Sequence, residues 1–93
     1  MSIAISSTNR PNLARQVRME WDPARKQQVL LAPEGVLVLN QTGATILSLC
    51  DGERTVVEIV EELRGTYNRV DGDEVRIFLA RLVAKRLVEL GDE

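Results

Sequence analysis

The sequence contains no histidine, one cysteine and three aromatic residues among 93 positions. Without histidine, the chain cannot form a catalytic triad or metal site that depends on imidazole. The single thiol, Cys50, cannot form an intrachain disulfide, which is typical of a reducing compartment, and we expect a cytoplasmic protein. No apolar run approaches the roughly 20 residues that a membrane span requires.

Several catalytic and binding signatures are also missing. There is no glycine-rich phosphate loop, and the cysteine and carboxylates lack the spacing of a zinc or iron–sulfur site. The segment Asp71-Gly72-Asp73-Glu74 resembles the start of a calcium loop, but the later ligands are absent, and a helix start explains it better. Cys50 has no base to activate it. We therefore expect a non-catalytic binding protein with no metal or cofactor.

The first half of the chain predicts strands. Val17, Met19 and Trp21 alternate with charged residues, which indicates a half-buried strand. Turn residues over 22–26 separate it from a second strand over 27–32, and the turn 33–35 leads into an apolar strand over 36–39. These runs predict a three-stranded antiparallel meander. Residues 1–16 show no period, and we expect them to form a flexible arm before a single domain over 17–90.

The second half predicts three helices. Asn40 can cap a helix over 41–50, and Thr55 with Glu58 forms a capping-box pattern at the start of a second helix. Asp71 can cap a third helix, which ends near Lys85 and Arg86. The third helix carries two apolar sides: a main stripe and a second side that includes Ile77, which is either core or a partner surface. The predicted fold class is α+β, with a three-stranded antiparallel meander followed by three helices.

The strand over 36–39 is the most unusual element of the predicted sheet. As the last strand of a meander it lies at an edge, yet it contains neither charge nor proline to block pairing with another chain. An edge of this kind is typical of β-augmentation, in which a peptide adds a strand. Two alternatives remain: the third helix or the N-terminal arm covers the edge, or two copies pair as a homodimer by strand pairing or exchange.

Short segments spread along the chain form a characteristic set: Trp21-Asp22, the turn over 30–35, Leu39-Asn40, Ile46-Leu47, the segment over 49–52, Arg54-Thr55-Val56, Glu58-Ile59 and Phe78-Leu79. In their order and spacing they resemble the PqqD family of pyrroloquinoline quinone biosynthesis. The resemblance covers about residues 15–88. It implies an α+β, winged-helix-like fold of three strands and three helices. It also implies a non-catalytic peptide chaperone, or leader-peptide recognition domain, that binds a ribosomal precursor peptide and presents it to a radical SAM enzyme.

The resemblance also implies where the peptide binds. Related leader-recognition domains take the peptide as an added strand between the third strand and the third helix. By position, the corresponding residues here are Val36, Leu37, Val38, Leu39, Val75, Phe78, Leu79 and Leu82. The resemblance leaves open which of them face the peptide and which face the core.

Two other functions fit parts of the sequence. A winged-helix DNA-binding regulator would use Arg76, Arg81, Lys85 and Arg86 on the third helix. Against it, the arginines lie well apart around the helix, and the net charge of −2 with a pI near 5.2 disfavours nucleic acid as the main partner. A structural dimer module is the third interpretation.

Overall fold

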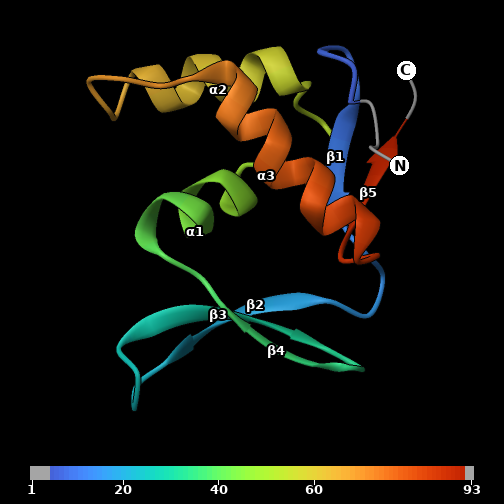
Figure 1. Ribbon diagram of the computed structural model, residues 1–93, viewed down its shortest axis with the longest axis vertical. Coiled ribbons are helices and arrows are strands. Elements are labelled where there is room, and N and C mark those ends of the chain that lie inside the picture. Colours follow the sequence, from blue (N-terminus) through green and yellow to red (C-terminus); the bar gives the residue numbers. More distant parts are fainter. Residues whose placement is uncertain (1–4, 92–93) are drawn as a thin grey trace.

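The computed structural model describes residues 5–91 and contains five strands and three helices (Figure 1). In chain order these are β1 (Arg10–Leu13), β2 (Arg18–Asp22), β3 (Gln27–Ala32), β4 (Gly35–Val38), α1 (Gln41–Ser48), α2 (Val56–Arg64), α3 (Gly72–Ala84) and β5 (Val88–Gly91). One sheet has the order β2-β3-β4, and the other pairs β1 with β5, all antiparallel. The α+β class, the meander and the three helices are therefore confirmed. The winged-helix description stays a prediction.

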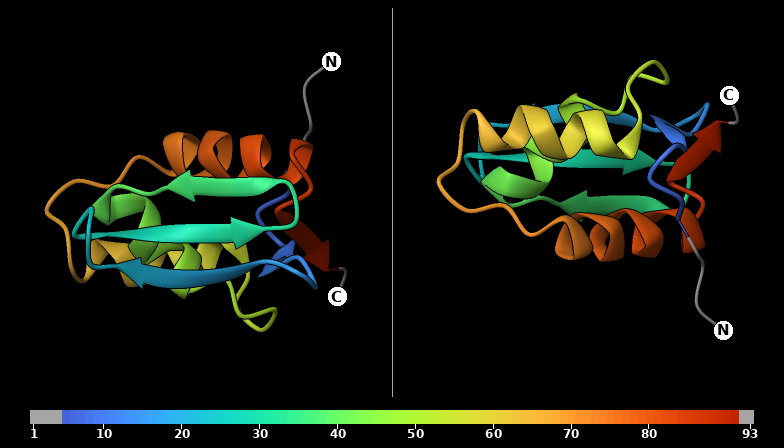
Figure 2. Two further views of the ribbon diagram at one scale, coloured as in Figure 1. Left: turned by 90° about the horizontal axis from the view of Figure 1, so that it is seen from below. Right: turned by 90° about the horizontal axis from the view of Figure 1, so that it is seen from above.

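The three-stranded sheet forms one layer, and the helices lie on one of its faces (Figures 1 and 2). The turn between β2 and β3 is held by Asp22, whose carboxylate accepts hydrogen bonds from the backbone of Ala24 at 3.0 Å and of Arg25 at 3.3 Å. The turn between β3 and β4 uses Gly35, whose φ of +152° is unfavourable for residues with a side chain. Both turns lie where the sequence predicts them.

The helix starts follow the predicted capping chemistry. Asn40 accepts a hydrogen bond from the backbone of Gly43 at 2.7 Å, and Asp71 accepts one from Asp73 at 2.9 Å. Thr55 and Glu58 form the complete capping box. These bonds satisfy backbone donors that the helix itself leaves free. The helices pack around an aliphatic core whose fully buried members include Leu30, Leu47, Ile59, Leu63 and Leu79.

The prediction of a flexible arm over residues 1–16 was wrong for the part that forms β1. Pro11 lies in this strand opposite Leu90, and the register places both in a pair that exchanges no backbone hydrogen bonds. A proline costs nothing there, because its missing N–H would not serve the pairing with β5. The Pro11 carbonyl accepts a hydrogen bond from the Gly52 backbone at 3.0 Å. Residues 1–4 of the predicted arm lie outside the described residues.

Strand β5 was also missed, because no element was expected after the third helix. Val88 is buried in the core, and Leu87 donates its backbone N–H to the carbonyl of Leu82 at 2.8 Å. Strands β1 and β5 thus form a second small sheet, in which β5 packs against α3. Within residues 5–91, no helix is long and apolar enough to cross a membrane.

Candidate functional site

Strand β4 has one free edge. It pairs with β3 on one side, and within residues 5–91 no strand pairs with its other side. The backbone N–H of Leu39 donates to the carbonyl of Gln28 at 2.9 Å, which fixes the alternation of hydrogen bonds along the pair. Leu37 therefore turns its N–H and C=O toward β3, whereas Val36 and Val38 turn theirs away from the sheet. The free edge offers two donors and two acceptors.

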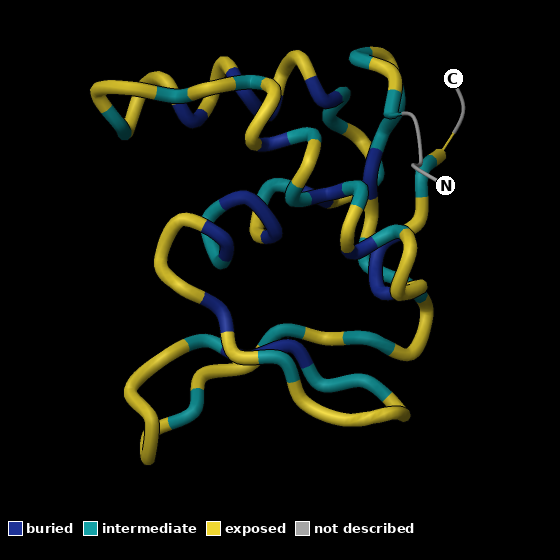
Figure 3. Tube along the Cα trace, viewed as in Figure 1, coloured by how far each residue is buried: buried dark blue, intermediate teal, exposed yellow. Residues whose placement is uncertain are grey.

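The side chains of β4 alternate between the two faces of the sheet. Val36 and Val38 lie on the outer face, away from the helices, and are 57% and 41% exposed. Leu37 is half-buried and Leu39 is buried, and their contacts with the core place them on the inner face, toward the helices. Figure 3 shows that much of the chain in the three-stranded sheet is exposed or half-buried. The predicted strand therefore presents its backbone and two valines to solvent.

Helix α3 contributes mostly core residues. Val75, Leu79 and Leu82 are buried in the same cluster as Leu39. Phe78 is half-buried and packs on the edge of this cluster. Of the eight residues predicted to bind a peptide, the structure thus buries four in the core and leaves Val36, Leu37, Val38 and Phe78 accessible.

A cleft of about 410 Å³ separates the start of β4 from the end of α3. Figure 2 shows α3 running along the β4 side of the sheet. The cleft is lined by Leu30, Ala32, Glu34, Gly35, Val36, Leu37, Lys85 and Leu87. Of these residues, only Val36 and Leu37 were predicted to bind the peptide. The others line the cleft because of the strand register and the path of the chain after α3.

A second hollow of about 210 Å³ lies near the other end of β4. Asn40 and Gly43 at the start of α1 line one side, and Glu74 and Phe78 of α3 line the other. The two hollows are therefore found toward opposite ends of α3, with Lys85 in the first and Glu74 in the second. Together with the free edge, they form the candidate binding surface.

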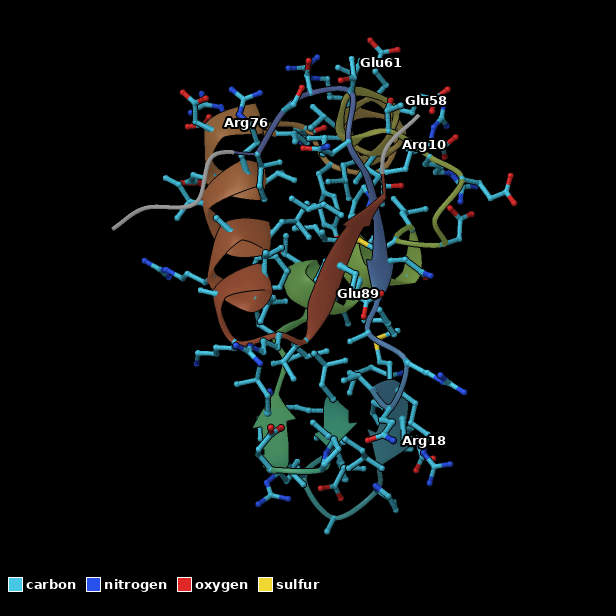
Figure 4. All side chains as sticks on the ribbon, turned by 90° about the vertical axis from the view of Figure 1, so that its right-hand side faces the viewer. Arg10, Arg18, Glu58, Glu61, Arg76 and Glu89 are labelled. Carbon is cyan, nitrogen blue, oxygen red and sulfur yellow. The ribbon has the colours of Figure 1, made fainter. Side chains whose placement is uncertain are left out.

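The charges at the start of α3 are mixed in sign. Arg76 forms an ion pair with Asp73 one turn earlier on the same helix. Figure 4 shows Arg76 on the part of α3 that is farther from the three-stranded sheet. Asp73 and Glu74 add negative charge in the first turn. One of the four cations predicted for a DNA-binding regulator is therefore already paired, and the carboxylates beside it would repel a phosphate backbone.

Cys50 is buried at the end of α1, and burial raises the pKa of its thiol to about 12. The thiol is therefore protonated at neutral pH, and its Sγ atom lies 3.3 Å from the carbonyl oxygen of Ile46. A protonated, buried thiol is not a nucleophile. Among residues 5–91 no three side chains of the metal-ligating types come together.

Comparisons with known proteins agree on one family. The family model described as coenzyme PQQ synthesis protein D (PqqD) matches residues 27–88. A protein of Stutzerimonas stutzeri named "PqqA binding protein" is 38% identical over 92% of this chain and 96% of its own length. A protein of the same name from Rhodopseudomonas palustris is 38% identical over 98% of this chain and 84% of its own length.

Two solved structures share the fold. The solution structure of the PqqD part of Methylobacterium extorquens PqqCD, described as a stand-alone RiPP recognition element, is 37% identical. It superimposes with a TM-score of 0.75 over 92% of this chain and 95% of that one. The heterocyclase TruD contains a similar unit, 29% identical with a TM-score of 0.66, which spans 89% of this chain but 12% of TruD. None of these proteins is named as a DNA-binding protein.

Proposed function

Since the chain belongs to the PqqD family, we propose that it is a non-catalytic recognition element of PQQ biosynthesis that binds the PqqA precursor peptide. The PqqA-binding relatives and the recognition-element structure support this function. The observation that carries it is the free edge of β4, where the outward backbone groups of Val36 and Val38 have no strand partner among residues 5–91 and lie beside an apolar cleft.

The edge supplies affinity, and the cleft supplies selectivity. A peptide segment that adds to β4 forms backbone hydrogen bonds with Val36 and Val38 and turns alternate side chains toward α3. A short added strand buries a modest area, so a dissociation constant on the order of micromolar is expected. No rearrangement of the core is needed, because Leu30 and Leu87, which line the cleft, are already buried in the core.

The partner that acts on the bound peptide is, in this proposal, a radical SAM enzyme. The protein would hold the peptide near that enzyme and so raise its effective concentration at the active site, which requires no chemistry from the protein itself. We place this encounter in the cytoplasm, where a ribosomal peptide is made. The same edge could instead join two copies, and a homodimer formed in this way would compete with the peptide.

An amide-shift titration with synthetic PqqA tests the function. We expect the amides of Val36 and Val38 to shift and to exchange more slowly with solvent once the peptide is bound, because each gains a hydrogen-bond partner. The amide of Leu37 serves as the internal control, since it already donates to β3. Shifts that cluster on the β2 edge instead, or no shifts at all, would contradict the proposal.

Two further measurements separate the alternatives. Weak dependence of the affinity on salt would agree with strand addition, whereas nucleic-acid binding falls steeply as salt rises. Sedimentation of the free protein over a range of concentrations reports whether copies pair. If pairing occurs through β4, added PqqA must dissociate it.

A further inference from the structure

The inner face of the sheet has a gap beside Gly35. Ala32 of β3 lies opposite Gly35 of β4, so the smallest two residue types face each other in this pair. The next pair on the same face is Leu30 and Leu37, which are both large. A Cβ atom added to Gly35 would meet no other atom within 4 Å. The gap is therefore open space and not a close approach of backbone.

The gap opens into the cleft beside α3. Leu30, Leu37 and Leu87 provide apolar walls, and Leu30 and Leu87 are buried. Glu34 and Lys85 lie exposed at the rim, and neither takes part in an ion pair among residues 5–91. An apolar floor with a polar rim fits one large aliphatic or aromatic side chain better than a charged one.

Strand geometry determines which peptide residue reaches this gap. Antiparallel pairing continues the pattern of the sheet and is slightly more stable per residue than parallel pairing. Four consecutive residues of a peptide strand that runs antiparallel to β4 then lie opposite positions 38, 37, 36 and 35 of β4, in that order. The first and the third of these four consecutive residues form the backbone hydrogen bonds. The last one turns its side chain to the inner face, into the gap.

We infer that the precursor peptide is selected by one large apolar anchor residue that occupies the gap beside Gly35, and that Ala32 sets the size of side chain accepted. This inference rests on the proposed function, because it assumes a peptide strand along β4. It makes Ala32 a specificity-determining residue even though Ala32 forms no part of the free edge. The anchor residue is the residue immediately after one that hydrogen-bonds Val36.

Filling the gap from the protein side tests the role of Ala32. Ala32→Leu places a large side chain in existing space and should leave the fold intact, but it should weaken PqqA binding about 10- to 100-fold. Ala44→Leu is the matched control, since Ala44 lines a separate groove of about 660 Å³ between the β2–β3 hairpin and α1. Calorimetry should show unchanged PqqA affinity for this control.

An alanine scan of the peptide identifies the anchor and completes the test. Against the unsubstituted protein, one apolar position should dominate the loss of affinity. A peptide with alanine at that position should bind the unsubstituted protein and Ala32→Leu with nearly equal affinity, because both changes remove the same contact between the anchor side chain and the gap. If Ala32→Leu weakens every peptide equally, or weakens none, the gap does not select the anchor.

Methylation of single peptide nitrogens tests the strand register. Binding should be lost when the nitrogen one or three residues before the anchor is methylated, and retained when the nitrogen two residues before it is methylated. Sensitivity at the anchor itself and two residues before it would overturn the antiparallel register. If PqqA fails to bind the unsubstituted protein at all, the proposed function fails, whereas binding without this pattern overturns the further inference alone.

Discussion

The aromatic ring of Phe78 lies against Gly43 in the first turn of α1. A Cβ atom added to Gly43 would come within 3.1 Å of the Phe78 ring and within 3.1 Å of the Asn40 side-chain oxygen. Gly43 is buried, and its backbone N–H donates to that same oxygen at 2.7 Å. The missing side chain of Gly43 thus allows α3 to approach the capped start of α1, next to the end of β4.

Gly43→Ala should therefore not give the usual benefit of removing glycine from a helix. That benefit is about 1 kcal/mol of unfolding free energy at an unhindered position, and displacement of Phe78 and Asn40 should offset it. Urea denaturation measures the difference. Gly72→Ala is the control, because a Cβ at Gly72 would only touch Val60 at 4.0 Å. Equal stabilisation by both substitutions would show that the Phe78 ring moves without cost.

Proline substitution distinguishes the two sides of β4. Val38→Pro removes an outward N–H and should leave the sheet intact while it sharply weakens PqqA binding. Leu37→Pro removes an N–H that faces β3, leaves the buried Leu30 carbonyl unpaired, and should destabilise the fold by about 1–3 kcal/mol. Thermal unfolding measures the stability of both variants, and calorimetry measures their affinity for PqqA. Undiminished peptide affinity in a folded Val38→Pro protein would exclude strand addition at this edge.

The meander and the helix starts could be predicted because local chemistry determines them. Asn40, Thr55 and Asp71 cap helices with their own side chains, and Gly35 marks its turn through a conformation that side chains disfavour. The free edge also followed from the sequence, since Val36–Leu39 lacks any charge or proline. These features depend on neighbours within a few residues along the chain.

The missed features depend on contacts between distant segments. Strand β1 is defined by its pairing with β5, and the two lie at opposite ends of the sequence. The gap beside Gly35 arises from a cross-strand pair, and Ala32 carries no local signal of it. Likewise, periodicity groups Val75, Phe78, Leu79 and Leu82 on one stripe of α3, but the packing alone buries three of them and leaves Phe78 accessible.

The end of α3 contains a strained residue that substitution should relieve. Arg86 follows the helix with φ of +63°, and its backbone N–H donates to Val83 at 2.9 Å while that of Leu87 donates to Leu82. Glycine is the residue best suited to this position. Arg86→Gly should therefore raise the unfolding free energy by roughly 0.5–1 kcal/mol, as measured by urea denaturation.

Lys85→Gly is the matched control for this change. Lys85 precedes Arg86 but has φ of −87°, which any residue adopts without strain. Glycine there only adds freedom to the unfolded chain, so the variant should be less stable than the parent. If Arg86→Gly is destabilising to the same degree, the Arg86 side chain contributes contacts that outweigh its backbone strain.

Acid should weaken the start of α2 through Glu58. Hydrogen bonds from the backbone N–H and then the hydroxyl of Thr55 hold the pKa of Glu58 below its ordinary value of 4.5. Because the folded-state pKa is lowered, the ionised form stabilises the protein above pH 4.5, and this contribution is lost as the pH falls through the lowered pKa. Glu58→Gln keeps an acceptor but not the charge. The variant should therefore have a lower unfolding free energy than the parent at pH 7, and this difference should shrink toward pH 3. A difference that stays constant with pH would contradict the prediction.

The second apolar side of α3 offers a way to separate enzyme docking from peptide binding. Ile77 is 53% exposed and lines neither hollow beside β4. Ile77→Asp should therefore change the unfolding free energy by less than about 0.5 kcal/mol and leave PqqA affinity unchanged. We predict that the proposed radical SAM enzyme docks on this side, so a pull-down with that enzyme should lose the variant, and retention of the variant would contradict the prediction. Val57→Asp, at a residue 47% exposed on α2, controls for the added charge. A collapse of the melting temperature in Ile77→Asp alone would show that Ile77 is covered in solution, and the docking prediction would then be wrong.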